Sequence, residues 1–402
     1  MNRSKCWWMV GACVVVLGCG DGGDVGDAGM GRDARVEDDA QVADGGAGDA
    51  GPGDAGAGDG GVEGACEGAC EDDEACVRGV CLATCGGDLS GIDAALAAGL
   101  APVVNVCRMG SSALDVIEGT AGALRVYELS AATVGATTTF TLSRWSLDAA
   151  GVATSSETIA TATHEGHAPD AIFVGGYLDV SDDESGAIFG YTTTDAGILG
   201  GVFDVEVGDG SVDELAAPGN YDGAWLDDAR WLVNGLGLGG ETGQGLYLHD
   251  TAGGSSRRAV DELGAYSGSV AVLGDVVIAG AAAAFGETWP DGVAMGDRVF
   301  VLDAAAVGAE PTISGWDDAL AHFAAPSTFE LIGGMRLASV VYDDAFMIAG
   351  FETRSLDDGV AGWTIGAPES LLTGGTFTGV VAAGETRVLL DHAGGLLLVA
   401  LE

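Results

Sequence analysis

The segment Gly223-Ala-Trp-Leu-Asp-Asp-Ala-Arg-Trp-Leu-Val-Asn-Gly235 consists of two apolar runs on either side of a tight acidic turn. The same pattern returns as Ser269-Val-Ala-Val-Leu-Gly-Asp-Val-Val-Ile-Ala-Gly280 and as Ser339-Val-Val-Tyr-Asp-Asp-Ala-Phe-Met-Ile-Ala-Gly350. Short apolar runs separated by Gly and Asp are typical of β-hairpins. We therefore predict that a hairpin is the repeated unit of this chain, with the acidic residues of each copy in the turn between its first two strands.

A third apolar run follows each hairpin and predicts a third strand. Looser copies of the hairpin begin at Gly176 and Gly379, and Leu114 to Thr161 supplies an earlier unit. The third runs are Gly201 to Val207, Gly245 to His249, Arg298 to Asp303, Gly362 to Ile365 and Gly395 to Val399. Repetition with a period of 40–50 residues is typical of arrays and closed rings of small sheets.

Units of about four short strands resemble the blades of a β-propeller, so we expect residues 101–402 to form one all-β propeller of six blades. A seventh blade could lie around Glu310 to Pro326, where the spacing of the repeats stretches. The resemblance is architectural, because the WD and kelch signatures are missing. An array of β-sandwiches and a β-solenoid are the alternative folds.

The last third strand, Gly395 to Val399, ends almost at the C-terminus, so the final blade lacks an outer strand. An open sheet edge would favour aggregation. The apolar run Ala101-Pro-Val-Val-Asn-Val-Cys107 precedes the first blade and has no other partner. We predict that it pairs with the last blade as its outer strand, with Pro102 tolerated at the start or edge of a sheet.

The N-terminus predicts export and lipid anchoring. Residues 1–18 combine Arg3 and Lys5 with an apolar run that is too short to span a bilayer, as in a signal peptide. Val16-Leu-Gly-Cys19 resembles the lipobox of bacterial lipoproteins, which implies that Cys19 is acylated, with palmitate among the chains, and becomes the mature N-terminus. An ordinary secretory signal is the alternative. The resemblance implies a place in the cell envelope, at the outer membrane, with the side of that membrane left open.

Residues 19–65 are Gly, Asp and Ala with few large apolar side chains, which predicts a disordered acidic tether. Residues 66–100 form a Cys-rich knob with a short helix after Gly91. Six cysteines outside the signal peptide and the lipid site predict three disulfides in an exported chain, with fifteen possible pairings. A zinc site is the weaker alternative. The six are Cys66, Cys70, Cys76, Cys81, Cys85 and Cys107.

The formal net charge of −46 argues against nucleic acid and anionic membrane surfaces as partners, because both repel a polyanion. We predict no cofactor. Calcium is a weak possibility, because acidic pairs recur and Asp179 to Ser185 alternates acids and hydroxyls, although Glu184 stands where a calcium loop needs Gly. His164-Glu-Gly-His167 is one residue short of a metalloprotease motif and is expected in a surface connection.

These patterns favour a non-enzymatic envelope module that binds a protein or glycan through one face of the propeller. A propeller-fold enzyme acting on a glycan and a calcium-dependent adhesion protein are the alternatives, and whether the chain is an enzyme stays open. Variable loops on a rigid scaffold concentrate binding groups, so we expect the ligand on the second-to-third strand connections. Trp289 could instead fold back over a neighbouring blade. The candidate residues are Trp289, Asp291, Glu241, Asp357 and Asp358.

Overall fold

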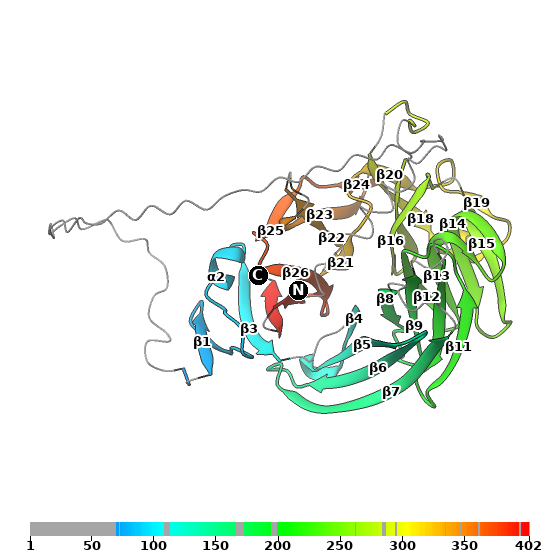
Figure 1. The fold of residues 1–402 in the computed structure, drawn as a ribbon. Coiled ribbons are helices and arrows are strands. Elements are labelled where there is room, and N and C mark those ends of the chain that lie inside the picture. The colour runs from blue at the N-terminus through cyan, green and yellow to red at the C-terminus, as the bar shows by residue number, and fades with distance from the viewer. Residues whose placement is uncertain are drawn as a thin grey trace, which may run out of the picture. The chain divides into compact units, whose positions relative to one another are not determined.

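The computed structural model is built almost entirely from strands and describes most of the chain after Cys70 (Figure 1). The signal peptide, Cys19, the tether and Cys66 lie outside the described residues. Among the described residues, no helix is long and apolar enough to cross a membrane. The structure describes residues 70–71, 73–107, 113–165, 173–193, 199–261, 263–283, 287–293, 296–333, 335–343, 345, 347–360, 362–393 and 395–401.

Six antiparallel sheets of the described chain follow one another as the blades of a ring, which confirms the predicted six-bladed propeller. Blade 1 contains β4 (Ala113–Glu118), β5 (Leu124–Val134), β6 (Thr137–Leu147) and β7 (Ala153–Glu165). Blade 2 contains β8 (Phe173–Val180), β9 (Gly186–Thr193), β10 (Leu199–Glu206) and β11 (Ser211–Ala216). Blade 3 contains β12 (Asp222–Asp227), β13 (Arg230–Leu238), β14 (Glu241–Asp250) and β15 (Ser255–Asp261).

The second half of the ring is less regular. Blade 4 contains β16 (Tyr266–Leu273), β17 (Val276–Ala282), β18 (Asp297–Asp303) and β20 (Ala321–Ala324). Blade 5 contains β21 (Glu330–Ile332), β22 (Arg336–Tyr342), β23 (Ile348–Gly359) and β25 (Glu369–Thr373), and β24 (Gly362–Ile365) extends β23 as a hairpin. Blade 6 contains β26 (Phe377–Ala382), β27 (Arg387–His392), β28 (Gly395–Leu401) and β3 (Leu100–Val106).

The ring closes as the sequence predicts, with an N-terminal strand in the last blade. Strand β3 pairs antiparallel with β28, from Leu100 opposite Leu401 to Val106 opposite Leu396. In Figure 1 the cyan strand β3 lies beside the red C-terminal strands. Pro102 falls on this outer strand, where a missing N–H group leaves few ladder bonds unmade. The closure prediction for residues 101–107 is therefore confirmed.

The stretch from Glu310 to Pro326 does not form a seventh blade. After the short helix α3 (Ala304–Gly308), β19 (Ile313–Ser314) adds to blade 3 by pairing parallel with β15, and β20 then completes blade 4. The spacing stretches here because one connection crosses from its own blade to the neighbouring blade and returns.

The sequence-based assignment of blade 5 is wrong by one strand. The hairpin from Ser339 to Gly350 forms the second and third strands, β22 and β23, and Gly362 to Ile365 is the extension β24. The true first strand, β21, has only three residues and carries no hairpin pattern of its own. Asp343 therefore lies in a second-to-third strand turn, and Asp344 lies outside the described residues.

Apolar packing between neighbouring blades forms the core. Strand β13 is buried over most of its length, because sheets cover both of its faces, and it therefore reads as a continuous apolar run. Trp231 and Tyr247 are fully buried in the cluster between blades 2 and 3. Outer strands such as β7 are largely exposed and mix Thr, Ser and Glu with Ala. Middle strands thus supply the apolar core, and outer strands face solvent.

The Cys-rich knob contains the hairpin of β1 (Glu74–Val77) and β2 (Val80–Ala83), followed by the expected short helix, α2 (Ile92–Ala95). Cys70 is bonded to Cys81, and Cys85 is bonded to Cys107. Cys76 is also disulfide-bonded, and its partner lies outside the described residues. Val77, Leu82 and Ile92 pack in one cluster with side chains of blades 5 and 6, so the knob shares the core of the propeller.

Candidate functional site

The first strands of the blades line the centre of the ring, and each is the edge strand of its sheet. An edge strand presents N–H groups that need partners. Among the described residues, a side chain from one blade accepts such a bond from the first strand of the next blade, or the residue just before it, at five junctions. The bonds run from Val180 N to Asp115, 2.7 Å; Trp225 N to Asp179, 2.7 Å; Val270 N to Asp222, 2.9 Å; Phe329 N to Ser269, 3.0 Å; and Ala382 N to Glu330, 3.3 Å.

Four of these five acceptors are carboxylates on the strands that line the centre of the ring. We call Asp115, Asp179, Asp222 and Glu330 the channel carboxylates. Burial raises the pKa of Asp115 to about 6, that of Asp222 to about 7 and that of Glu330 to about 8. Burial also raises the pKa of Asp179 well above its usual range, with the charge of Asp115 as the second cause. The backbone N–H groups that donate to these carboxylates lower their pKa, but the effect of burial is larger. The channel carboxylates therefore release their protons at a higher pH than exposed acids do.

The channel carboxylates do not form a ready chelate. Within the described chain, the one group of acids, cysteines and histidines with ligand atoms close enough to share a metal is Cys70, Glu74 and Cys81. Cys70 and Cys81 are bonded to each other, so that group is not a metal centre. The channel carboxylates instead connect neighbouring blades, because each accepts a hydrogen bond from a backbone N–H group of the next blade.

The sequence carried a signal for the channel carboxylates that a search for paired acids missed. The tripeptide Leu-Asp-Val occurs at Leu114–Val116 and again at Leu178–Val180, at equivalent points of two consecutive first strands. Asp222 and Glu330 take the same role without that tripeptide. An acid in four of the six first strands was the signal, and only the ring closure brings these residues together.

The two rims of the propeller differ, and the predicted ligand residues divide between them. We name the rim with the first-to-second and third-to-fourth strand turns the AB rim, and the opposite rim the BC rim. Trp289 and Asp291, in the β17–β18 connection, and Glu241, at the start of β14, lie on the BC rim.

Asp357 and Asp358 lie on the other rim. They follow Ser355, which pairs with Arg336 directly after the first turn of blade 5, so the β23–β24 hairpin projects from the AB rim. The prediction that they share a face with Trp289 is wrong, because the sequence pattern suggests a second-to-third strand connection from Ser355 to Gly362, where the structure has the end of β23 and its hairpin with β24. Both side chains are exposed.

Trp289 is only 5% exposed and packs rather than presenting its ring to solvent. Its ring stacks on Trp316 with centroids 5.7 Å apart, and its Nε1 donates to Gly296 O over 3.0 Å. The Arg298 guanidinium lies over both rings, at 5.5 Å from Trp289 and 5.2 Å from Trp316, and forms an ion pair with Asp291. Trp289 thus belongs to the cluster between blades 3 and 4, which fits the expectation that it covers a neighbouring blade.

The acidic turns of the AB rim are matched by arginines. Three of the second strands place an arginine in their first or second residue and pair it with an acid of a first-to-second turn or first strand. Further acids cap their own turns: Asp148 accepts from Ala150 N and Val152 N, and Asp183 accepts from Ser185 N. The three arginine pairs are Arg125 with Glu184, Arg230 with Asp227, and Arg387 with Glu118.

The Asp179 to Ser185 segment uses its acids within the fold. Asp179 bonds to Trp225 N, and Asp183 holds Ser181 and Ser185. Glu184, at a φ of 58°, accepts the Tyr127 hydroxyl over 2.6 Å and pairs with Arg125 of blade 1. The segment thus serves as a junction between blades 1 and 2 in this structure.

His164 lies in a strand and not in a surface connection. It is the penultimate residue of β7, and its Nδ1 lies 2.8 Å from the Tyr191 hydroxyl and 3.0 Å from Glu214. The prediction of a linker is wrong, because the Thr-rich run before it is an outer strand. His167 lies outside the described residues. The contact joins blades 1 and 2.

Exposed large apolar side chains gather on the BC rim. Of the eight in the described chain, five lie on second-to-third strand connections or beside them. Val341, Tyr342 and Met347, 37%, 42% and 45% exposed, flank one turn of blade 5, and we name them the blade-5 patch. Val293, in the long connection of blade 4, and Val134, in blade 1, are the other two.

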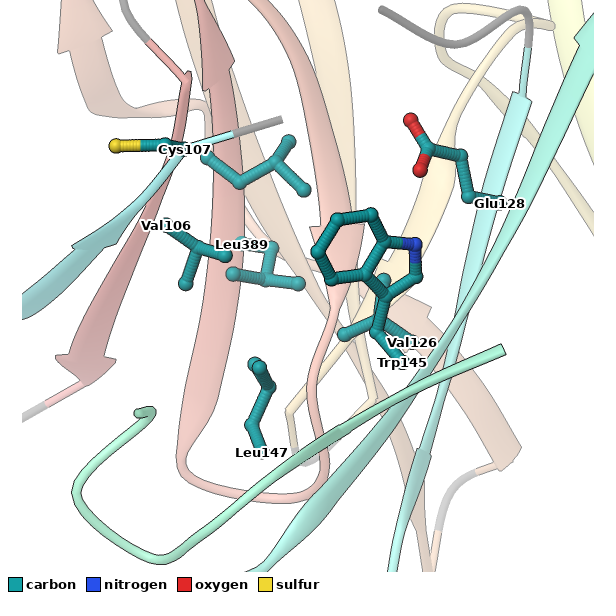
Figure 2. Close-up of a pocket in the computed structure, with 8 residues that line it drawn as sticks. Val106, Cys107, Val126, Glu128, Trp145, Leu147 and Leu389 are labelled. Atoms are coloured by element: carbon teal, nitrogen blue, oxygen red, sulfur yellow. The ribbon is translucent and has the colours of Figure 1, made fainter. Parts of the chain in front are cut away.

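A cavity of about 10 Å³, room for a single water, lies at the joint between blades 1 and 6. Figure 2 shows Val106 and Leu389 of blade 6 on one side and Val126 and Trp145 of blade 1 on the other. In the described chain, the Trp145 Nε1 group has no hydrogen-bond partner. The cavity is too small for an organic ligand and marks the seam at which the ring closes.

Comparisons with known proteins show similarity in fold alone. No family model matches the sequence, and no curated protein matches it. The β-propeller domain of the Trilobed protease from Pyrococcus furiosus is 9% identical, with a TM-score of 0.33 over 71% of this chain and 92% of that chain. A putative TolB from Agrobacterium tumefaciens is 13% identical, with a TM-score of 0.37 over 72% of this chain and 89% of that chain. At these values the likeness carries no argument about function.

Proposed function

We propose that this chain is an exported, lipid-anchored and non-enzymatic binding module that holds a protein partner on the BC rim of its propeller. The anchor rests on the lipobox-like Val16 to Cys19, and the tether of residues 19–65 would hold the propeller away from the membrane. The rim assignment rests on the structure. Both parts are tested separately below.

The observation that supports the BC rim is the position of the exposed apolar side chains. Soluble proteins rarely leave several large apolar residues together in solvent unless the surface has a partner. Tyrosine is enriched among the residues that dominate binding energy, and Tyr342 lies in the blade-5 patch. The AB rim instead carries acids that are capped or paired with arginine.

The partner's chemistry follows from charge. The chain is strongly acidic, and Glu165, Glu241, Glu287 and Asp343 are exposed at or near the BC rim. A basic protein surface with an apolar centre would complement this rim and would be steered toward it. An aliphatic patch with one tyrosine favours a protein over a glycan, whose binding sites commonly use exposed aromatic rings.

Co-purification from native membranes tests this proposal with two matched variants. Tyr342→Ser with Met347→Ser alters the blade-5 patch, and Val152→Ser with Val360→Ser removes two exposed apolar residues of the AB rim. We expect the first variant to lose at least about fivefold of the bound partner, from about 1 kcal/mol for an interface anchor. The second variant should bind like the wild type. Equal loss in both variants, or recovery of a glycan in place of a protein, would overturn the proposal.

A further inference from the structure

The strand that closes the ring lies inside a loop that is itself closed by a disulfide. Cys85 and Cys107 are bonded, with Cα atoms 5.2 Å apart, and they lie 22 positions apart in sequence. Strand β3, from Leu100 to Val106, lies wholly between them. A second bond, Cys70–Cys81, closes the preceding hairpin. A covalent path therefore runs from Cys70 to Cys81, along the chain to Cys85, and across to Cys107 without passing through β3.

We propose that these two disulfides form a strap that carries tension from the N-terminal tether past β3 and into blade 1. The use of the strap rests on the proposed lipid anchor, which would pull on the N-terminal side whenever a partner holds the propeller. The load path itself follows from the covalent connections alone. The strap keeps the closing strand out of the path along which tension travels.

Without the strap, tension would separate β3 from β28, starting at the end where Leu100 pairs with Leu401. Leu100 pairs with Leu401, so the chain enters β3 at the same end at which β28 leaves the blade. Tension between the tether and the C-terminus would then separate β3 from β28 one residue pair at a time, beginning with Leu100 and Ala101. Loss of β3 would expose the edge of β28, which is an aggregation hazard.

With the strap, tension enters the propeller at Cys107, beyond the opposite end of β3. Val106 pairs there with Leu396. Tension between Cys107 and the C-terminus then acts along β28, so that many backbone hydrogen bonds of this strand share it. The two disulfides thus change how the hydrogen bonds are loaded. Without them the bonds between β3 and β28 break one after another, and with them many bonds bear the tension together.

Polar contacts keep the strap seated when no tension acts. Arg78 donates to the carbonyl oxygens of Leu96, Ala97 and Leu100 over 2.6–2.9 Å, and its Nε lies 2.8 Å from Asp93. Asn105 donates to Ala83 O over 2.8 Å. These bonds fasten the knob to the start of β3 at Leu100 and near its end at Asn105, so the disulfides are not slack connections.

Single-molecule stretching of the full mature chain tests the strap, with one handle at its N-terminus and one after residue 402. In the variant Cys85→Ser with Cys107→Ser, we expect an early opening of β3 at low force. It should release about 70 Å of chain, from 22 residues at about 3.5 Å each less the original separation. The wild type should show no such event and should yield at higher force. The control, Cys70→Ser with Cys81→Ser, leaves Cys85–Cys107 intact and should also lack the 70 Å event.

A second measurement covers the chance that the double variant fails to fold. Cys107 is exposed, so a mild reductant added to the folded wild type should reach its bond and produce the same early event. A 70 Å release in the oxidised wild type, or an unchanged trace after reduction, would overturn the strap. Neither result depends on lipidation or on a partner, so a failure of the proposed function would leave this test unaffected.

Discussion

Glu330 gives the sharpest prediction about the channel carboxylates. Its Oε1 accepts the Ala382 N–H over 3.3 Å, and its other carboxylate oxygen accepts no bond in the described chain. A glutamine can therefore keep the interblade hydrogen bond while it removes the charge. The groups that face Glu330 are Asp222, Asp115 and Asp179, all of them acids.

The sign of the pH effect follows from the raised pKa. Burial raises the pKa of Glu330 from an ordinary 4.5 to about 8, so the folded state keeps a proton that the unfolded chain loses. Stability then falls as the pH rises from 4.5 to 8, and the loss is complete above pH 8. At 1.36 kcal/mol per pH unit, the upper limit is about 5 kcal/mol. The Glu330 side chain is only half-buried, so solvent screens its charge and we expect a loss of about 2 kcal/mol.

The assay is thermal unfolding of the wild type and of Glu330→Gln at pH 5 and at pH 9. At pH 9 the variant should melt about 4 °C higher, at roughly 2 °C for each kcal/mol in a chain of this size. At pH 5 the two should differ by less than about 1 kcal/mol, because Glu330 is protonated in the folded wild type and is then as neutral as the glutamine. Glu385→Gln, an exposed glutamate in a turn of the AB rim, is the matched control and should change neither curve.

Two outcomes would refute this reasoning. One is a wild type that is more stable at pH 9 than at pH 5, because the channel carboxylates all act in the opposite direction. The other is an identical pH dependence for the wild type and Glu330→Gln, which would show that the buried charge costs nothing.

Three further predictions concern the anchor, the closing strand and Trp289. Mass spectrometry of the mature N-terminus should find an acylated Cys19, and a Cys19→Ser protein that stays fixed to membranes would contradict the anchor. Deletion of residues 101–107 should lower the melting temperature sharply, because β3 covers the edge of β28, and an unchanged melting curve would contradict closure by this strand. Trp289→Ala should cost about 3–5 kcal/mol of stability, because the ring is buried against Trp316 and Phe300, and a variant that melts like the wild type would contradict this packing.

The sequence was sufficient to predict the propeller, the number of blades and the closing strand. Regular hairpins such as Gly223 to Gly235 carry apolar runs and turn residues that depend on local chemistry alone. The closing strand could be predicted because the sequence contains one apolar run without a partner and one blade without an outer strand. Pairing the two satisfies both. Blade 5 could not, because its three-residue first strand carries too little pattern to be recognised.

The candidate site was harder to predict, because it depends on convergence in space. Asp115 and Asp179 lie 64 positions apart, and only the ring brings them within range of one another. The orientation of Trp289 depends on Trp316 and Arg298, from other parts of the fold. A loop tryptophan reads the same in sequence whether it faces solvent or the core. Side-chain orientation and convergence are therefore the parts that sequence patterns leave undetermined.

The central claim, that the BC rim holds a protein partner, is tested most directly by site-specific photocrosslinking in intact cells. A photoreactive residue at Met347, in the blade-5 patch, should capture one protein partner of defined size. The same residue at Val360, which is exposed on the AB rim, should capture none. Capture of that partner from Val360 and not from Met347 would contradict the account.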